Sequence, residues 1–171
     1  MNVAVTGASG YVGGMMSRFL DAAGHHVLAW SRRPCPGDWN FYEISNDPAG
    51  LPWAEVQALV HAAYDFGPGT WREVLAVNVN PSIRLLKAAV ENGVKQLVFI
   101  SSISSFEGTR SLYGRAKLAI EKECLAMGGT VIRPGLVWGD QPGVRRDDKR
   151  HSEQRQPDGH LRHCCDDYQS G

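Results

Sequence analysis

The stretch TGASGYVG, residues 6–13, decides the fold class, because it joins an apolar run at residues 2–6 to a helix-like stretch. Its G-x-x-G-x-x-G spacing gives each glycine a separate task. Gly7 permits a tight turn, Gly10 lets a pyrophosphate approach the backbone, and Gly13 permits close packing of the helix. The N-terminus of such a helix offers N–H groups and a positive dipole to phosphates. The stretch therefore predicts a dinucleotide site, and a glycine-rich turn without a ligand is the alternative.

Apolar runs alternate with helix-like stretches along the chain, the pattern of β-α-β units on a parallel sheet. Pro81 lies inside the second long helical stretch, so that helix should kink or start again there. The fold class is thus α/β, a Rossmann-like doubly wound parallel sheet. The strands are expected at 2–6, 26–30, near 41–44, 58–63, 96–101 and 130–138, and the helices from the glycine motif to about 23, at 70–92 and at 112–127.

The character of the chain changes near Asp140. Residues 140–171 are rich in charge and histidine, and no apolar period of a strand or helix runs through them. Such a segment cannot bury enough apolar surface to offset the entropy lost on ordering. We therefore expect a dinucleotide-binding domain at 1–139 and a disordered or out-of-frame tail at 140–171.

Composition excludes several classes of partner. Lysine plus arginine and aspartate plus glutamate each number 18, so charge gives no reason to expect nucleic acid or an anionic membrane. No apolar run reaches the roughly 18 residues of a membrane span, and the N-terminus has a strand pattern rather than that of a signal peptide. The four cysteines form no C-x-x-C pair and match no zinc spacing. We expect no metal and a reducing, cytoplasmic setting.

The end of the second predicted strand bears on which dinucleotide binds. An acidic residue there would bond the ribose 2′-hydroxyl of NAD. The sequence instead has Arg32 and Arg33 directly after Ser31, and guanidinium groups suit a 2′-phosphate better. These residues favour NADP, with NAD possible; a solvated basic loop is the alternative.

Tyr113 and Lys117 lie four residues apart and therefore share one face of the predicted helix. A neighbouring ammonium should lower the phenol pKa from about 10 and suit the pair to acid–base chemistry at a carbonyl or alcohol. The preceding strand ends in serines, and ligands in such sheets bind beyond the carboxyl ends of strands. For Ser104 and Ser105 we favour a plain turn, and we expect His61 to be a hydrogen-bonded core histidine rather than a catalyst.

Together these segments resemble the extended short-chain dehydrogenase/reductase superfamily of NAD-dependent epimerases and dehydratases. The resemblance covers about residues 1–139 and is specific as a combination rather than piece by piece. The segments, in family order, are TGASGYVG (6–13), VHAAY (60–64), NVNPSIRLLKAA (78–89), VFISSIS (98–104), YGRAKLAIE (113–121) and VIRPGLVWG (131–139).

The resemblance implies roles for individual residues. Ser102, Tyr113 and Lys117 would form the catalytic set, with Tyr113 as the acid/base and Lys117 on the nicotinamide ribose. Either Asn78 or Asn80 would brace the cofactor site. The remaining cofactor-side positions would be Gly7, Gly10, Tyr11, Val12, Gly13, Ala62, Ala63, Ser101 and Pro134.

The resemblance also implies an activity and a missing part. We expect hydride transfer with Tyr/Lys/Ser acid–base chemistry on a sugar nucleotide or a small carbonyl or alcohol. Family members continue into a C-terminal substrate domain, which the resemblance does not find in this chain, and weak or absent turnover is therefore one expectation. A non-catalytic dinucleotide-binding module or redox sensor is the alternative, and the helices at 70–92 and 112–127 match the family's homodimer face.

Overall fold

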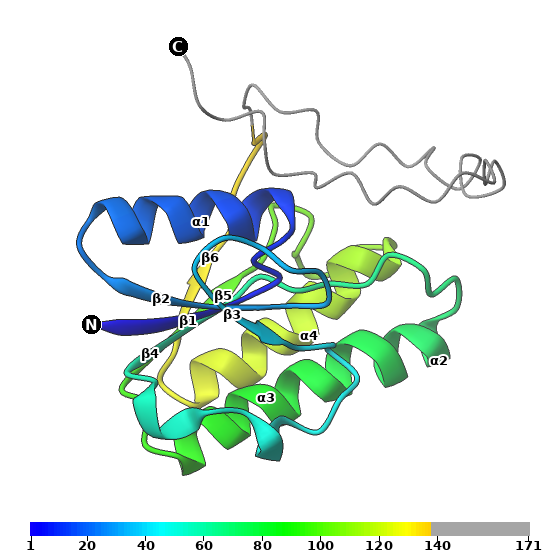
Figure 1. Ribbon diagram of the computed structural model, residues 1–171. Helices are drawn as coiled ribbons and strands as arrows, with labels where there is room; N and C mark the ends of the chain where they lie inside the picture. Colours follow the sequence, from blue (N-terminus) through cyan, green and yellow to red (C-terminus); the bar gives the residue numbers. More distant parts are fainter. Residues whose placement is uncertain (138–171) are drawn as a thin grey trace, which may run out of the picture. The chain divides into compact units, whose positions relative to one another are not determined.

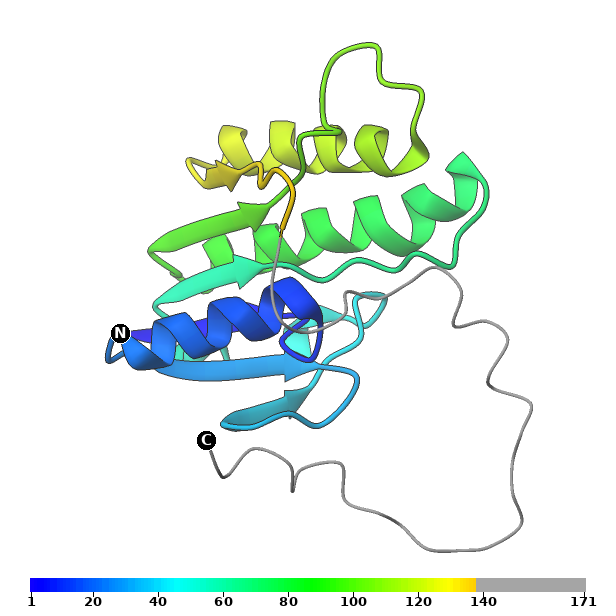
Figure 2. The ribbon, with the colours of Figure 1, turned by 90° about the horizontal axis from the view of Figure 1, so that it is seen from above.

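The computed structural model describes residues 1–137 of the chain. A six-stranded sheet, parallel throughout, runs in the order β3-β2-β1-β4-β5-β6 (Figure 2). The order changes direction between β1 and β4, which makes the carboxyl ends of those strands the usual ligand position. The predicted Rossmann-like doubly wound sheet is confirmed. The strands are β1 (Asn2–Thr6), β2 (His26–Ser31), β3 (Asp38–Phe41), β4 (Ala58–His61), β5 (Gln96–Ile100) and β6 (Thr130–Ile132).

Helices cover both faces of the sheet. The helix α1 (Tyr11–Ala22) lies on one face, and α3 (Asn80–Glu91) and α4 (Leu112–Ala126) lie on the other (Figure 1). Each face has its own apolar core, as a sheet buried on both sides requires. The core under α1 includes Val3, Val5, Val60 and Ile100, and the core under α3 and α4 includes Trp30, Leu59, Leu86, Phe99 and Ile120. Within residues 1–137, no helix is both long and apolar enough to cross a bilayer.

The second long helix is interrupted, as the sequence predicted. It opens as α2 (Trp71–Val74), with a capping box in which the Thr70 side chain accepts from the Glu73 amide. A π-helical turn, Leu75–Val79, follows, and α3 starts at Asn80 with Pro81 in its first turn. Proline has no N–H for the preceding turn, so the regular ladder breaks just before it. The π-helical turn buries Asn78 and leaves Asn80 exposed.

Some predicted boundaries were wrong. The third strand lies at Asp38–Phe41, earlier than 41–44, because the apolar residues used to place it are buried after the strand rather than within it. Tyr42 packs against Trp30, with ring centroids 6.2 Å apart, whereas β3 itself is a largely exposed edge strand. The fourth strand ends at His61 instead of Ala63, and the sixth ends at Ile132. The end of the predicted sixth strand at Trp138 and the tail predicted at 140–171 lie outside the described residues.

Candidate functional site

The loop between β1 and α1 is built by glycines that the protein's own packing requires. Gly7 has φ +70°, and a Cβ there would lie 2.9 Å from the Ala63 Cα. A Cβ at Gly13 would overlap the carbonyl oxygen of Gly7. Gly10 differs, because a Cβ there would meet only the Gly7 oxygen, at 3.1 Å. The space outside Gly10 is therefore left open by the fold and remains accessible to a ligand.

The N-terminus of α1 is suited to an anion. Gly10 is its N-cap, no side chain caps it, and its first turn holds no acidic residue. The amide groups of Tyr11, Val12 and Gly13 thus belong to a first turn whose N–H groups have no partner inside the helix. An unsatisfied helix N-terminus beside an open glycine is the arrangement that binds diphosphates. The residues present therefore fit the phosphates of a dinucleotide.

A buried hydrogen-bonded chain joins this loop to β4 and α3. The Thr6 hydroxyl lies 2.7 Å from His61 Nδ1, and His61 Nε2 lies 2.8 Å from the Ser82 hydroxyl. The amides of Ala62 and Ala63 donate to Thr6 Oγ1, at 3.2 and 3.3 Å. Burial, together with the Lys117 charge, lowers the pKa of His61 to about 3, so the ring is neutral at physiological pH. His61 is a hydrogen-bonded core residue, as the sequence predicted.

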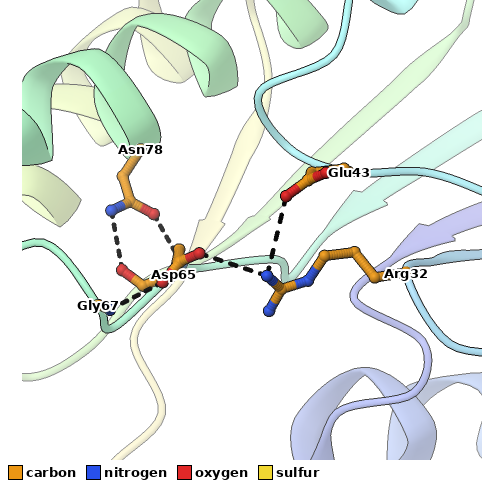
Figure 3. A network of polar contacts seen from close by, with 5 residues as sticks. All are labelled: Arg32, Glu43, Asp65, Gly67 and Asn78. Carbon is orange, nitrogen blue, oxygen red and sulfur yellow. Dashed lines mark hydrogen bonds and ion pairs between the residues drawn. The ribbon is translucent and has the colours of Figure 1, made fainter.

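A polar network connects the segment after β4 to the end of β2 (Figure 3). The buried side chain of Asn78 accepts from the Asp65 amide at 2.7 Å and donates to the Asp65 carbonyl at 2.9 Å. The Asp65 carboxylate in turn accepts from the Gly67 amide at 2.7 Å. Arg32 at the end of β2 places Nη1 3.4 Å from Asp65 and 3.9 Å from Glu43. The segment after β4 is thus pinned by Asn78 and connected by charge to β2.

Tyr113, at the start of α4, lies in an aromatic cluster. Its ring centroid is 4.9 Å from that of Tyr64, in an edge-on arrangement, and 5.6 Å from that of Phe66, which stacks on it. The capping Ser111 accepts from the Gly114 amide and thereby sets where α4 begins. Gly114 is also required, because a Cβ there would overlap the Ser104 carbonyl. This close approach seats Tyr113 against the loop that carries Ser102.

Lys117 lies one turn further along α4, and 2% of its surface is exposed. Its Nζ donates to the Ile100 carbonyl at 2.8 Å and lies 4.7 Å from the Phe99 ring centroid and 5.6 Å from that of Tyr113. Burial lowers the pKa of Lys117 to about 7, and the charge of Glu121 opposes this shift. The ammonium is thus held at the carboxyl end of β5, under the phenol.

The expected direction of the Tyr113 pKa was wrong. Burial raises the pKa of this phenol above 10, and a hydrogen bond with the Ser102 side chain opposes the rise. Lys117 does not lower it here, because its Nζ is directed to the Ile100 carbonyl and carries a reduced charge. Tyr113 is therefore a protonated phenol at neutral pH.

The segment after β6 lies beside the loop that follows β5. The Ser101 amide donates to the Ile132 carbonyl at 2.7 Å, and the Ile103 amide donates to the Pro134 carbonyl at 3.4 Å. Pro134 is thereby held beside the loop of Ser102. Its neighbour Arg133 forms a two-point contact with Glu121 of α4, at 2.9 and 2.6 Å.

The structure places most of the predicted site residues along one edge of the sheet. Arg33 is exposed and Ser101 is buried, and neither makes a side-chain contact with the catalytic set among the described residues. Sequence reasoning did not identify Asp65 or the contact between the rings of Tyr64 and Tyr113. It also missed Glu121, which could have been found because it continues the four-residue spacing from Tyr113 and Lys117. No cluster of potential metal ligands occurs within residues 1–137.

Comparisons with known proteins agree with this geometry. The model of the NAD dependent epimerase/dehydratase family matches residues 3–153. The UDP-glucose 4-epimerase of Vibrio cholerae is 27% identical over 180 residues, an alignment covering 84% of this chain and 53% of that protein. A short-chain dehydrogenase/reductase superfamily protein from Agrobacterium tumefaciens, solved with bound NAD, is 25% identical with a TM-score of 0.64, over 78% of this chain and 48% of that one.

A further solved structure, MoeE5 in complex with UDP-glucose and NAD, is 28% identical with a TM-score of 0.60. The match covers 79% of this chain and 53% of that one. The chain thus spans about half the length of these relatives. The family match extends past residue 139, where the recognisable motifs end. Motifs, sheet order and family model agree over the described residues, and this chain belongs to the NAD dependent epimerase/dehydratase family.

Proposed function

We propose that this chain is the nucleotide-binding part of an NAD(P)-dependent epimerase, dehydratase or reductase that acts on a sugar nucleotide or a small carbonyl or alcohol. One observation carries the proposal: the open glycine loop with its uncapped helix and the Ser102–Tyr113 pair over Lys117 lie along the same edge of the sheet. The relatives solved with UDP-glucose and NAD support it.

The phosphates of the dinucleotide would be held by main-chain amides of α1, with Tyr11, Val12 and Gly13 in the first turn and Gly10 free of a side chain. Ala62 and Ala63 would line the adenosine side through their backbone, because their amides are held by Thr6. Asn78 would act indirectly, by fixing the segment at Asp65.

The nicotinamide, when bound, supplies the acceptor and donor of a hydride. Tyr113 would move the proton on the substrate oxygen, since its phenol is protonated at neutral pH and bonds to Ser102. Ser102 would orient that oxygen. Lys117 would stabilise the phenolate that is left when Tyr113 donates its proton to a carbonyl oxygen during reduction, because its Nζ lies under the same ring. Ser101 and Pro134 would complete the wall beside Ser102.

The proposal is tested by titrating NADH into the protein and following nicotinamide fluorescence. Gly10→Ala should weaken binding at least about tenfold, a loss of about 1.4 kcal/mol, because its methyl group occupies the phosphate position. Gly14→Ala is the matched control, since its Cβ would also meet one backbone oxygen, that of Ala8, at 3.2 Å but one turn inside α1. Equal affinity of both variants and the wild type would refute the proposal.

The choice between NAD and NADP would depend on Arg32 and Arg33. Two guanidinium groups favour NADP, which we keep as the proposed form alongside NAD. Arg32 is already shared with Asp65 and Glu43, so its preference for a 2′-phosphate should be modest. The two solved structures named above contain NAD. Parallel titrations with NADPH and NADH decide between the two forms.

A second function uses the glycine loop but not the tyrosine: a non-catalytic dinucleotide-binding module or redox sensor. The loop and the uncapped N-terminus of α1 support it, since neither involves Tyr113. Tyr113→Phe separates the two functions: it should abolish any hydride transfer while leaving NADH affinity unchanged. Binding without transfer in both the wild type and the variant would favour the module.

Two further expectations belong to this proposal. A homodimer would use the helices at 70–92 and 112–127, that is α2, α3 and α4; on this face Arg115 lies 4.1 Å above the Trp71 ring beside a depression of about 330 Å³. Light scattering on the wild type and on Trp71→Ala tests it, and a monomeric wild type would refute it. A reducing, cytoplasmic setting fits the free thiols of Cys35 and Cys124.

A further inference from the structure

The ion pair between Glu121 and Arg133 is the strongest polar contact in the described chain that the proposed chemistry does not use. Only 2% of the Glu121 side chain is exposed, and both of its oxygens are engaged by Arg133, at 2.9 Å from Nε and 2.6 Å from Nη2. Two-point contacts of this kind fix orientation as well as charge. The pair connects α4 to the segment directly after β6.

Glu121 lies four residues beyond Lys117, so both side chains point to the same side of α4. The Ser101 and Ser105 hydroxyls are buried near the carboxylate, and within residues 1–137 neither has a hydrogen-bond partner of ordinary geometry. Burial alone would raise the pKa of Glu121, but the Arg133 guanidinium, together with the two neighbouring serine hydroxyls, brings it below its usual value. The carboxylate is therefore a permanent negative charge at neutral pH.

Lys117 has no other carboxylate among its recorded neighbours. The groups that face it are His61, which is neutral, the phenols of Tyr64 and Tyr113, and the ring of Phe99. Rings and the Ile100 carbonyl solvate an ammonium only partly, and an unpaired buried charge is costly. Among residues 1–137, Glu121 is the carboxylate that lies one turn away on the same face of α4 and can offset this cost.

We propose that Glu121 is a positioning residue of this site: it lies one turn from Lys117 on the same face of α4 as that residue's countercharge, and its two-point contact with Arg133 holds the Arg133–Pro134 segment beside Ser102. This inference rests on the proposed function in so far as Lys117 acts with Tyr113. Glu121 would touch neither substrate nor cofactor. Glu121 would act through Lys117 and through the backbone at Pro134.

The test is the titration of Lys117 itself, followed by NMR on protein labelled with [ε-13C]lysine, with Lys117→Met to assign the signal. In the wild type, Lys117 should titrate near its shifted pKa of about 7. Glu121→Gln keeps the shape and one acceptor oxygen but removes the charge, and it should lower this pKa by about one unit. Glu123→Gln, which removes a carboxylate from another side of α4, should leave it unchanged.

An unchanged pKa in Glu121→Gln, or one that rises toward the ordinary lysine value, would overturn the inference, since a purely structural loosening exposes Lys117 to water. If Glu121→Gln fails to fold in a thermal melt, Glu121→Gln/Arg133→Gln takes its place, because removing both charges leaves none unpaired. The Lys117 pKa should again fall, but by less than in Glu121→Gln, because a neighbouring positive charge is removed as well. A wild type that shows this titration but binds no NADH would refute the proposed function and leave the inference standing.

Discussion

The two halves of the site are built from different materials. At the carboxyl ends of β1 and β4, backbone and neutral groups do the work: Gly7 and Gly13 allow close contacts, and Thr6 and His61 form an uncharged hydrogen-bonded chain. At the ends of β5 and β6, the same edge is held by charged groups: Lys117 of α4 donates to the Ile100 carbonyl, and Glu121 of α4 forms a two-point contact with Arg133 after β6.

This difference fits what each half is proposed to do. A diphosphate needs fixed donors and an absence of side chains, which glycines and main-chain amides supply at any pH. A proton-transfer site needs groups whose charge responds to their surroundings, and burial moves the pKa of Lys117 to about 7. We therefore expect added side-chain volume to have its largest effect in the neutral half. Changes of charge should have their largest effect in the charged half.

Gly13→Ala tests the packing half most severely. The added methyl group would overlap the Gly7 carbonyl, which has no room to move because Gly7 is itself packed on Ala63. We expect a loss of about 3 kcal/mol in the free energy of unfolding, measured by urea denaturation. Gly14→Ala, one position along α1, should change it by less than about 1 kcal/mol. Equal losses would mean that the loop is not tightly packed.

His61 gives the neutral half a pH dependence of its own. Its pKa is about 3 in the folded protein and 6.5 when unfolded, so below pH 6.5 the unfolded chain binds a proton that the folded chain does not. Stability should therefore fall as the pH drops from 6.5 toward 3, by about 1 kcal/mol between pH 6 and pH 5. His61→Gln should remove this contribution and His25→Gln should not. A slope that is the same in all three proteins would contradict the neutral assignment.

The neutral half was also the predictable half. Its signals are local: the glycine spacing lies within residues 6–13, and the strands on either side show in their apolar runs. Pro81 likewise placed the break in the second helix correctly. The third strand was misplaced because Tyr42 and Ile44, which resemble strand residues, are buried by packing at the sheet edge instead. An exposed edge strand has few apolar residues, so its position is hard to predict from the sequence.

In the charged half, the sequence predicted that Tyr113 and Lys117 lie together but not their charge states or their contacts. Tyr113 and Lys117 are one helical turn apart, so their common face follows from spacing. The direction of the Tyr113 pKa did not follow, because it depends on burial and on where Lys117 directs its proton. Arg133 and Glu121 are twelve positions apart on different elements, and Arg32 and Asp65 thirty-three, so neither pair has a local signal.

On the neutral side, Arg32 forms charged contacts with Asp65 and Glu43, and its contact with Asp65 gives the smallest expected effect. Asp65→Asn keeps an oxygen for the Gly67 amide and the backbone contacts to Asn78, but it removes the carboxylate that faces Arg32. A 2′-phosphate would then meet a free guanidinium and one negative charge fewer. The ratio of NADPH to NADH affinity should rise, as measured by parallel fluorescence titrations.

The rise should be no more than about fivefold, because more than half of the Arg32 side chain is exposed and such pairs contribute at most about 1 kcal/mol. Glu43→Gln is the graded control: its carboxylate lies further from Arg32, at 3.9 Å, so its effect should be smaller still. High salt should reduce both effects, since exposed charges are screened. An unchanged ratio in Asp65→Asn would show that Arg32 does not face the 2′ position, and the preference for NADP would then depend on Arg33 alone.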